Sequence, residues 1–123
     1  MLTINTPMGN VELNSSEMFW IPKRGISTRL NFGEDIVNSC ICPGPQGSIG
    51  GILLFGSEGL VMFLRLPALT IIQSLRLERP PDAVHVVFNE GHGHLVLAEQ
   101  EVLNIRPLSS LEKIVSVVEC ERK

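Results

Sequence analysis

The residues that could carry chemistry gather in one short segment, Glu90-Gly91-His92-Gly93-His94. His-x-His on a β-strand places both imidazoles on one face, because side chains alternate along a strand. A third histidine, His85, lies on the preceding apolar run. Three imidazoles across one hairpin could hold a divalent metal ion such as Zn²⁺ or Fe²⁺. The segment also has the composition of a polar hairpin turn, so both interpretations stay open.

Two of the three cysteines, Cys40 and Cys42, share one face of an expected strand. Same-face neighbours on one strand seldom suit a disulfide, and two thiols are an incomplete zinc set. We expect both thiols to be free and buried. With Cys120, the odd count and the lack of a framework spacing favour a reducing compartment.

Neither glycine-rich segment predicts a catalytic loop. The segment 47–51 lacks the lysine and the following helix of a phosphate-binding loop, and the segment 56–59 lacks the spacing of a nucleophile elbow. We therefore expect no catalytic residue and no cofactor.

The segments that we expect to position these residues form an internal repeat of two copies along the chain. The stretch from Asp35 to Glu78 recurs, shorter, from Asp82 to Glu119. Four pairs are identical at an offset of 42 residues: Leu66/Leu108, Leu69/Leu111, Ile72/Ile114 and Ser74/Ser116. A period in the low forties, built from short apolar runs, is typical of a four-stranded β-propeller blade.

Each copy contains four short apolar runs separated by turn residues. The runs are 36–42, 51–55, 60–66 and 69–77 in the first copy, and 83–88, 94–98, 102–106 and 111–118 in the second. Such runs joined by short turns predict an antiparallel meander, and strands apolar on both faces indicate sheets covered front and back.

The division of the chain follows from the repeat. We expect an N-terminal segment with half a blade (1–34), two blades (35–79 and 80–119) and a tail (120–123). The half blade rests on Phe19-Trp20-Ile21-Pro22 and the run 26–32, which resemble the end of the next copy. The predicted fold class is all-β, with about two and a half antiparallel four-stranded propeller blades in an incomplete ring.

Composition narrows the function classes. The chain has 123 residues, 44% of them hydrophobic, and a net charge of −3, so we expect one globular domain without affinity for nucleic acid. The N-terminus lacks the pattern of a signal peptide, and the apolar region 49–66 contains Arg65 and turn residues. We expect a cytoplasmic protein without integral membrane insertion.

The two copies resemble blades of WD-repeat propellers, although the Gly-His and Trp-Asp signature dipeptides are absent. Within that class, the residues 58–69 (EGLVMFLRLPAL) and 88–97 (FNEGHGHLVL) are similar to strands and turns of the lethal giant larvae/tomosyn family. This resemblance implies a cytoplasmic scaffold in cell polarity or vesicle exocytosis, peripheral to membranes. SNARE proteins or polarity proteins are the partners it implies.

Two functions follow. The first is a non-enzymatic protein–protein interaction scaffold, a fragment or isoform of a longer protein or one that self-associates through uncovered blade faces. The second is a small metal-dependent β-barrel enzyme of cupin type that uses His85, His92 and His94.

Overall fold

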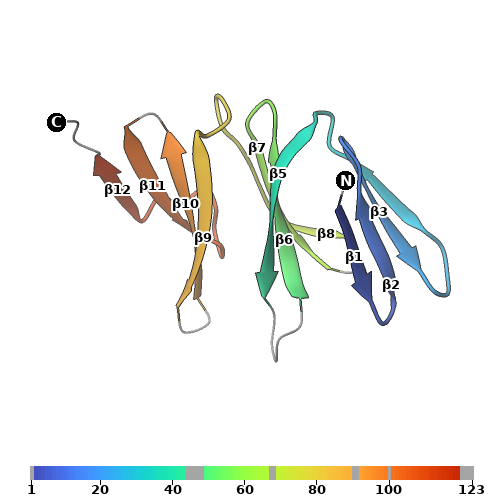
Figure 1. Ribbon diagram of the computed structural model, residues 1–123. Helices are drawn as coiled ribbons and strands as arrows, with labels where there is room; N and C mark the ends of the chain where they lie inside the picture. The colour runs from blue at the N-terminus through green and yellow to red at the C-terminus, as the bar shows by residue number, and fades with distance from the viewer. Residues whose placement is uncertain (1, 44–48, 67–68, 90–91, 100, 120–123) are drawn as a thin grey trace.

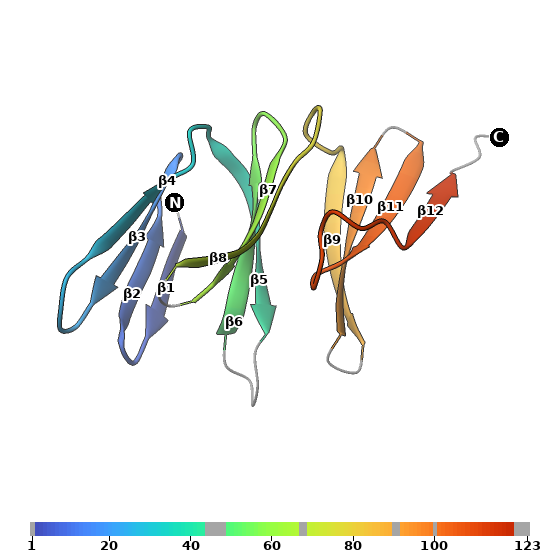
Figure 2. The same ribbon diagram turned by 180° about the vertical axis from the view of Figure 1, so that it is seen from behind.

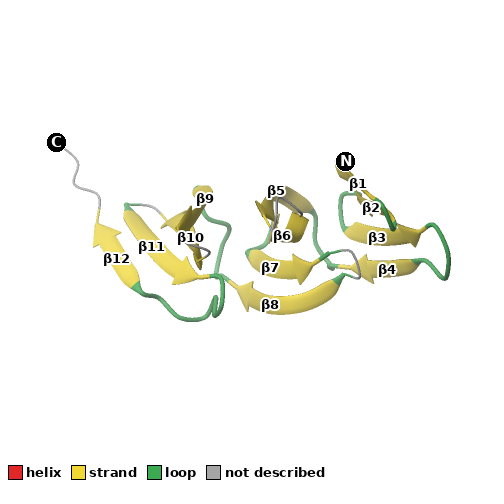
Figure 3. Cartoon of the chain, turned by 90° about the horizontal axis from the view of Figure 1, so that it is seen from below, coloured by secondary structure: helices red, strands yellow, loops and turns green. Residues whose placement is uncertain are grey.

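The computed structural model describes residues 2–43, 49–66, 69–89, 92–99 and 101–119, and their only regular elements are β-strands. The strands form three antiparallel four-stranded sheets that follow one another in chain order (Figure 1). In Figures 2 and 3 the sheets stand in a row, with the second between the other two. The predicted all-β fold class is confirmed. In the described part of the chain, no helix has the length and apolar character to cross a membrane.

The N-terminal segment forms a complete sheet, which corrects the expectation of half a blade. Its strands, in spatial order, are β1 (Leu2–Thr6), β2 (Gly9–Leu13), β3 (Glu17–Pro22) and β4 (Thr28–Asn31). The expected half blade corresponds to β3 and β4, and the hairpin of β1 and β2 that begins at Leu2 completes the sheet. Neither β1 nor β2 forms a continuous apolar run, because every second residue in them is polar, and the sequence therefore did not predict them. Ile4 and Val11 are buried, whereas Thr3 and Asn5 are exposed.

The second and third sheets correspond to the two copies of the repeat. The second contains β5 (Ile36–Pro43), β6 (Ile49–Gly56), β7 (Leu60–Arg65) and β8 (Thr70–Arg76). The third contains β9 (Ala83–Asn89), β10 (His92–Glu99), β11 (Val102–Pro107) and β12 (Ser116–Glu119). Each strand pairs with the next one along the chain, as in the predicted meander.

The fourth run of each copy is shorter as a strand than the sequence suggests. Leu69 has a positive φ of 57° and lies before β8, and Leu111 lies in the turn before β12. Both side chains are buried, as are Leu66 and Leu108 earlier in the same turns. The identical leucines at the 42-residue offset thus mark two equivalent turns that fold inward, and apolarity alone did not distinguish them from strand residues.

The first junction joins the first two sheets. Val11 and Met18, on one face of the first sheet, are buried against Ile52 and Leu54 of β6. Because side chains alternate along a strand, the neighbouring residues of β6 point to the other side of the sheet and do not contribute to this junction. One strand therefore contributes to two separate cores.

The second junction joins the second and third sheets. Leu53 and Phe55 of β6 point away from the first sheet and are buried with Leu95 and Leu97 of β10. Leu53, Leu95 and Leu97 are fully buried. The second sheet is the only described one with both faces covered, which explains why β6 reads as a continuous apolar run.

The far face of the third sheet, which we call the open face, is covered by no described residue. The strand registers place these aliphatic side chains on it: Val87, Val96, Ala98, Leu103, Ile105 and Val118. His85 and His94 share this side of the sheet. Val87 and Val118 are 43% and 45% exposed.

Replacing Leu97 with alanine should lower the free energy of unfolding by about 2–5 kcal/mol, because it leaves a cavity in the second junction. Ile26→Ala is the control, since Ile26 is 90% exposed, and it should change stability by less than about 0.5 kcal/mol. Urea denaturation followed by circular dichroism measures both. Equal stability of the two variants would contradict the assigned packing.

Candidate functional site: the junctions between the sheets

The three histidines do not form a metal site among the described residues. His85 on β9 is opposite Val96, and His94 on β10 is opposite Val87, so the two lie diagonally on one side of the sheet. The backbone of His92 begins β10, but its side chain, like Glu90 and Gly91, lies outside the described residues. No group of three described His, Cys, Asp or Glu residues is arranged to hold a metal ion. The alternative of a closed cupin-type barrel is wrong, because the strands form three separate sheets.

Cys40 and Cys42 lie on the same face of β5 and are free thiols, as expected. Cys42 is buried and Cys40 is half-buried. Burial raises the pKa of the Cys42 thiol to about 11, with a further contribution from Cys40, and burial also raises the pKa of Cys40. A protonated, buried thiol is a poor nucleophile, so this pair contributes to packing rather than to chemistry. Cys120 lies outside the described residues.

A buried carboxylate, Glu34, ties the connection between the first two sheets to the β6–β7 turn. Glu34 Oε2 accepts hydrogen bonds from the amide of Glu58 at 2.6 Å and from that of Leu60 at 3.4 Å. Its other oxygen, Oε1, lies 2.7 Å from Arg76 Nη2 at the end of β8. The Glu34 side chain is 1% exposed. This one residue therefore contacts a hairpin turn and a strand end of the second sheet at once.

The turn is shaped to admit this carboxylate. A Cβ at Gly56 would collide with the Glu34 side chain, and Gly59 has a φ of +101°, which favours glycine. Burial alone would raise the pKa of Glu34, but the amide hydrogen bonds and Arg76 outweigh it, so the pKa lies below its ordinary value. The arrangement has the features of a structural ion pair, since every partner belongs to the same junction. Sequence reasoning missed it because the glutamate and its partners are 24 to 42 residues apart.

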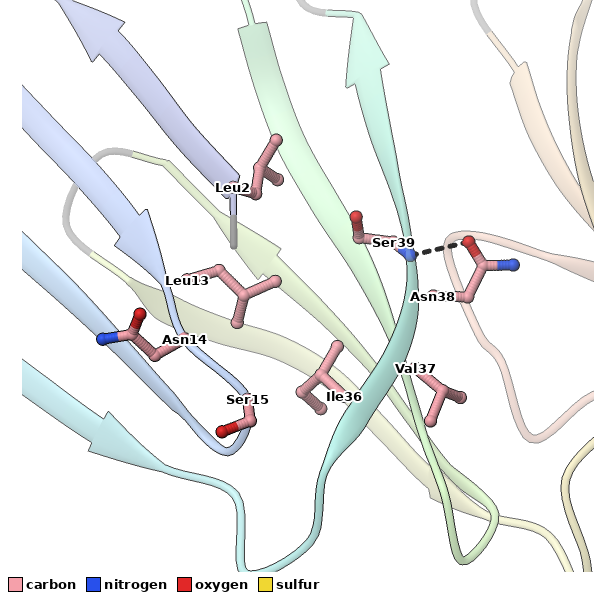
Figure 4. Close-up of a pocket in the computed structure, with 8 residues that line it drawn as sticks. All are labelled: Leu2, Leu13, Asn14, Ser15, Ile36, Val37, Asn38 and Ser39. Atoms are coloured by element: carbon pink, nitrogen blue, oxygen red, sulfur yellow. Dashed lines mark hydrogen bonds between the residues drawn. The ribbon is translucent and has the colours of Figure 1, made fainter.

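A hollow of about 320 Å³ lies at the first junction between β1, β2 and β5 (Figure 4). Leu2, Leu13 and Ile36 lie between the two sheets, whereas Val37 and Asn38 lie on the other side of β5. Its polar groups are already engaged in part, since the Ser39 amide donates to Asn38 Oδ1 at 2.9 Å. The lining contains no charged side chain, so it has little with which to orient a polar ligand.

The second junction has a polar hollow at one end, of about 490 Å³. Two of its charged residues, Arg76 and Arg106, have partners within the fold: Arg76 contacts Glu34, and Arg106 Nη1 donates to the Leu111 carbonyl at 2.8 Å. Asn104, which is buried, donates to Glu99 Oε2 at 2.5 Å. These contacts explain how polar residues are tolerated on a face that is otherwise aliphatic.

The other end of the second junction is an apolar hollow of about 540 Å³, which we call the second-junction groove. Its lining comes from both sheets: Phe63, Ile72, Phe88, Gly93, His94, Pro107, Leu108 and Ser109. Phe88 is 40% exposed, although its aromatic ring belongs to the face turned toward the second sheet. Gly93 lets Phe88 and Leu108 approach, since a Cβ there would lie 2.8 and 2.5 Å from them. A cleft of this size and character can take a few apolar side chains of a ligand.

Two interactions hold the shape of the groove. Gln73 Nε2 on β8 donates to the Ser109 carbonyl at 2.9 Å, which links the second sheet to the turn after β11. The Leu108 amide donates to the Gly93 carbonyl at 2.9 Å. Sequence reasoning placed Gly93 and His94 correctly in a hairpin but could not predict that Phe63 and Ile72 would stand opposite them.

A scan against protein-family models and a search of curated proteins both found no match. Among solved structures, the chain is similar to the crystal structure of BamB from Moraxella catarrhalis, with a TM-score of 0.66 and 10% sequence identity. The superposition covers 98% of this chain and 35% of that one, so this chain spans about a third of BamB. BamB is a β-propeller protein. The sheets are propeller blades.

The predicted blade architecture is thereby confirmed. At 10% identity the likeness shows the fold alone. The WD-repeat type and the likeness to the lethal giant larvae/tomosyn family stay predictions.

Replacing Glu34 with glutamine should lower the free energy of unfolding at pH 7 by about 1–3 kcal/mol, since charge-assisted hydrogen bonds are lost. A carboxylate with a lowered folded-state pKa stabilises the fold above its ordinary value, 4.5, and this contribution disappears as the pH falls through the lower value. Denaturation curves across the acid range should show the two proteins converging. A constant difference at all pH values would contradict the role of the charge.

The control for Glu34 is the exposed pair of Glu17 and Arg29, whose Oε2 and Nε atoms are 2.8 Å apart. Arg29 is 66% exposed, so water screens the pair. Glu17→Gln should therefore cost less than about 1 kcal/mol at pH 7.

In the native protein, Cys42 should resist iodoacetamide at pH 8, because only about one thiol in a thousand would be ionised there. Cys40 should react faster, because it is half-buried. Peptide mapping by mass spectrometry reports each site, and protein unfolded in guanidinium provides the reference. Equal labelling of Cys40 and Cys42 in the native state would contradict the greater burial assigned to Cys42.

Proposed function

We propose that the chain is a non-enzymatic protein-interaction module whose binding site is the second-junction groove. The observation that carries this proposal is an apolar hollow of about 540 Å³ between two sheets, with a 40% exposed phenylalanine at its side. Exposed aromatic residues beside a preformed cleft are typical of binding hot spots. The rigid sheets supply the shape and the groove supplies the affinity.

The chemistry of the groove favours a ligand that inserts apolar side chains. Phe63, Phe88 and Leu108 provide aromatic and aliphatic surface on both sides. Ser109 is the polar residue of the lining whose hydroxyl can form hydrogen bonds with the backbone of a bound segment, because the His94 side chain lies on the other side of the sheet. An amphipathic protein segment meets both requirements, because its apolar side chains enter the groove and its polar face stays in water.

The resemblance of residues 58–69 and 88–97 to the lethal giant larvae/tomosyn family supports a particular class of partner. SNARE proteins contain amphipathic segments with apolar side chains at helical spacing, and we propose them, or polarity proteins, as the partners. The module would then act in vesicle exocytosis or cell polarity, in the cytoplasm and peripheral to membranes. The free thiols Cys40 and Cys42 support a reducing compartment.

The test is titration of the protein with a synthetic SNARE heptad segment, followed by NMR of the backbone amides. Phe88→Ala should weaken binding at least about tenfold, the effect of losing 1.4 kcal/mol of contact. Ile21→Ala is the matched control, because Ile21 is also 40% exposed but lies on the first sheet. Absence of binding to SNARE segments and polarity proteins, or equal weakening by both variants, would overturn the proposal.

A further inference from the structure

Two charged residues are buried in the described part of the chain, and their partners differ. Glu34 is paired with the guanidinium of Arg76. Arg106, on β11, is 7% exposed, and its Nη1 donates to the Leu111 carbonyl, which carries no net charge. The Nε atom of Arg106 is buried and has no hydrogen-bond partner. A buried donor without an acceptor is costly, and more so when it belongs to a charged group.

The hydrogen bond of Arg106 determines which edge of its guanidinium is open. The group is planar, and Nε and Nη2 carry parallel N–H bonds along one edge, whereas Nη1 lies away from that edge. The Leu111 carbonyl engages Nη1 and leaves the Nε–Nη2 edge. Two parallel N–H donors match the two oxygens of a carboxylate, which accepts both hydrogen bonds at once.

The open edge belongs to a residue that lines the polar hollow of the second junction, whose volume is about 490 Å³. Arg106 is opposite Leu95 in the β10–β11 pair, so its side chain points into this junction, as that of Leu95 does. The same lining contains Arg79, which is exposed, and the aliphatic side chains of Leu75 and Val102. The hollow therefore combines a buried cation, an exposed cation and an apolar wall.

Two glutamates of the lining distinguish between possible anions. Glu99 Oε2 accepts a hydrogen bond from Asn104 Nδ2, and Glu78 is exposed. Their negative charges repel a doubly charged phosphate more strongly than a singly charged carboxylate. The charge of the hollow therefore favours a carboxylate.

We propose that the polar hollow is a binding site for a carboxylate group, which accepts hydrogen bonds from Nε and Nη2 of Arg106. Arg79 supplies a second positive charge, and Leu75 and Val102 contact the carbon atoms that carry the carboxylate. A free organic acid and the acidic side chain of a protein both offer this chemistry. The site lies at the end of the second junction away from the groove, and it goes beyond the proposed interaction with apolar side chains.

The test follows the Nε–H signal of Arg106 by NMR in the full chain while succinate is added at constant ionic strength. The signal should shift saturably, with a dissociation constant of about 1–10 mM, as expected for so small a ligand. Arg106→Lys keeps the charge, removes the paired donors and identifies the signal by its loss. It should weaken succinate binding, measured on the backbone amides of Val102 and Asn104, at least about tenfold.

Arg29→Lys is the matched control, because it makes the same substitution at a side chain that is 66% exposed on the first sheet. It should bind succinate like the unmodified chain. Circular dichroism shows whether Arg106→Lys is folded, and if it is not, the Nε–H signal of the unmodified chain decides. No saturable shift up to about 100 mM succinate, phosphate binding as tight as that of succinate, or equal effects of the two lysine variants would overturn the proposal.

A second pair of probes distinguishes the two sources of the carboxylate. Acetyl-Ala-Glu-amide should bind and acetyl-Ala-Gln-amide should not, since only the first carries a carboxylate. Tighter binding of the glutamate peptide than of succinate supports a protein ligand, and the reverse supports a free organic acid. Phe88→Ala should leave succinate binding unchanged, because Phe88 lines the groove at the other end of the junction. The carboxylate site and the groove therefore fail or succeed separately.

Discussion

The structure depends on one constraint: a four-stranded sheet with aliphatic faces is stable only when another sheet covers it. The stack of Leu53 and Phe55 on Leu95 and Leu97 satisfies this constraint at the second junction, and Ile52 and Leu54 satisfy it at the first. A single strand, β6, serves both junctions through its alternating side chains. Removing one sheet would therefore expose a face of its neighbour, and the repeats share their stability with the sheets beside them.

Polar contacts refine an arrangement that apolar burial creates. Glu34 reaches from the connection between two sheets into the turn of the second, where the amides of Glu58 and Leu60 and the guanidinium of Arg76 meet it. This carboxylate ties the entry of the chain into the second sheet to the β6–β7 turn and to the end of β8. At the next junction, Gln73 and the Ser109 carbonyl do the same between β8 and the turn after β11.

The same principle accounts for the second-junction groove and for the open face. The groove lies at one end of the second junction, where Gly93 lacks a side chain to fill it and Phe88 stays partly exposed. The open face exists because a sheet of the same construction has no described neighbour. The groove is a gap between sheets that are already paired, and the open face is a face that no described residue covers. Both are consequences of stacking sheets rather than additions to the fold.

The sequence by itself determined the strands of the second and third sheets and their pairing into meanders. An apolar run predicts a strand, and the Gly, Pro and Asn residues that bound it predict a turn, so both depend on local chemistry. It also determined that Cys40 and Cys42 would be free. It misjudged the first sheet, where polar residues interrupt β1 and β2, and it extended the fourth strands over Leu69 and Leu111, whose burial comes from inward-folded turns. Only the tertiary structure decided that Phe63 would face Phe88 across a groove and that Glu34 would meet Arg76, because these partners are brought together by stacking and are far apart along the chain.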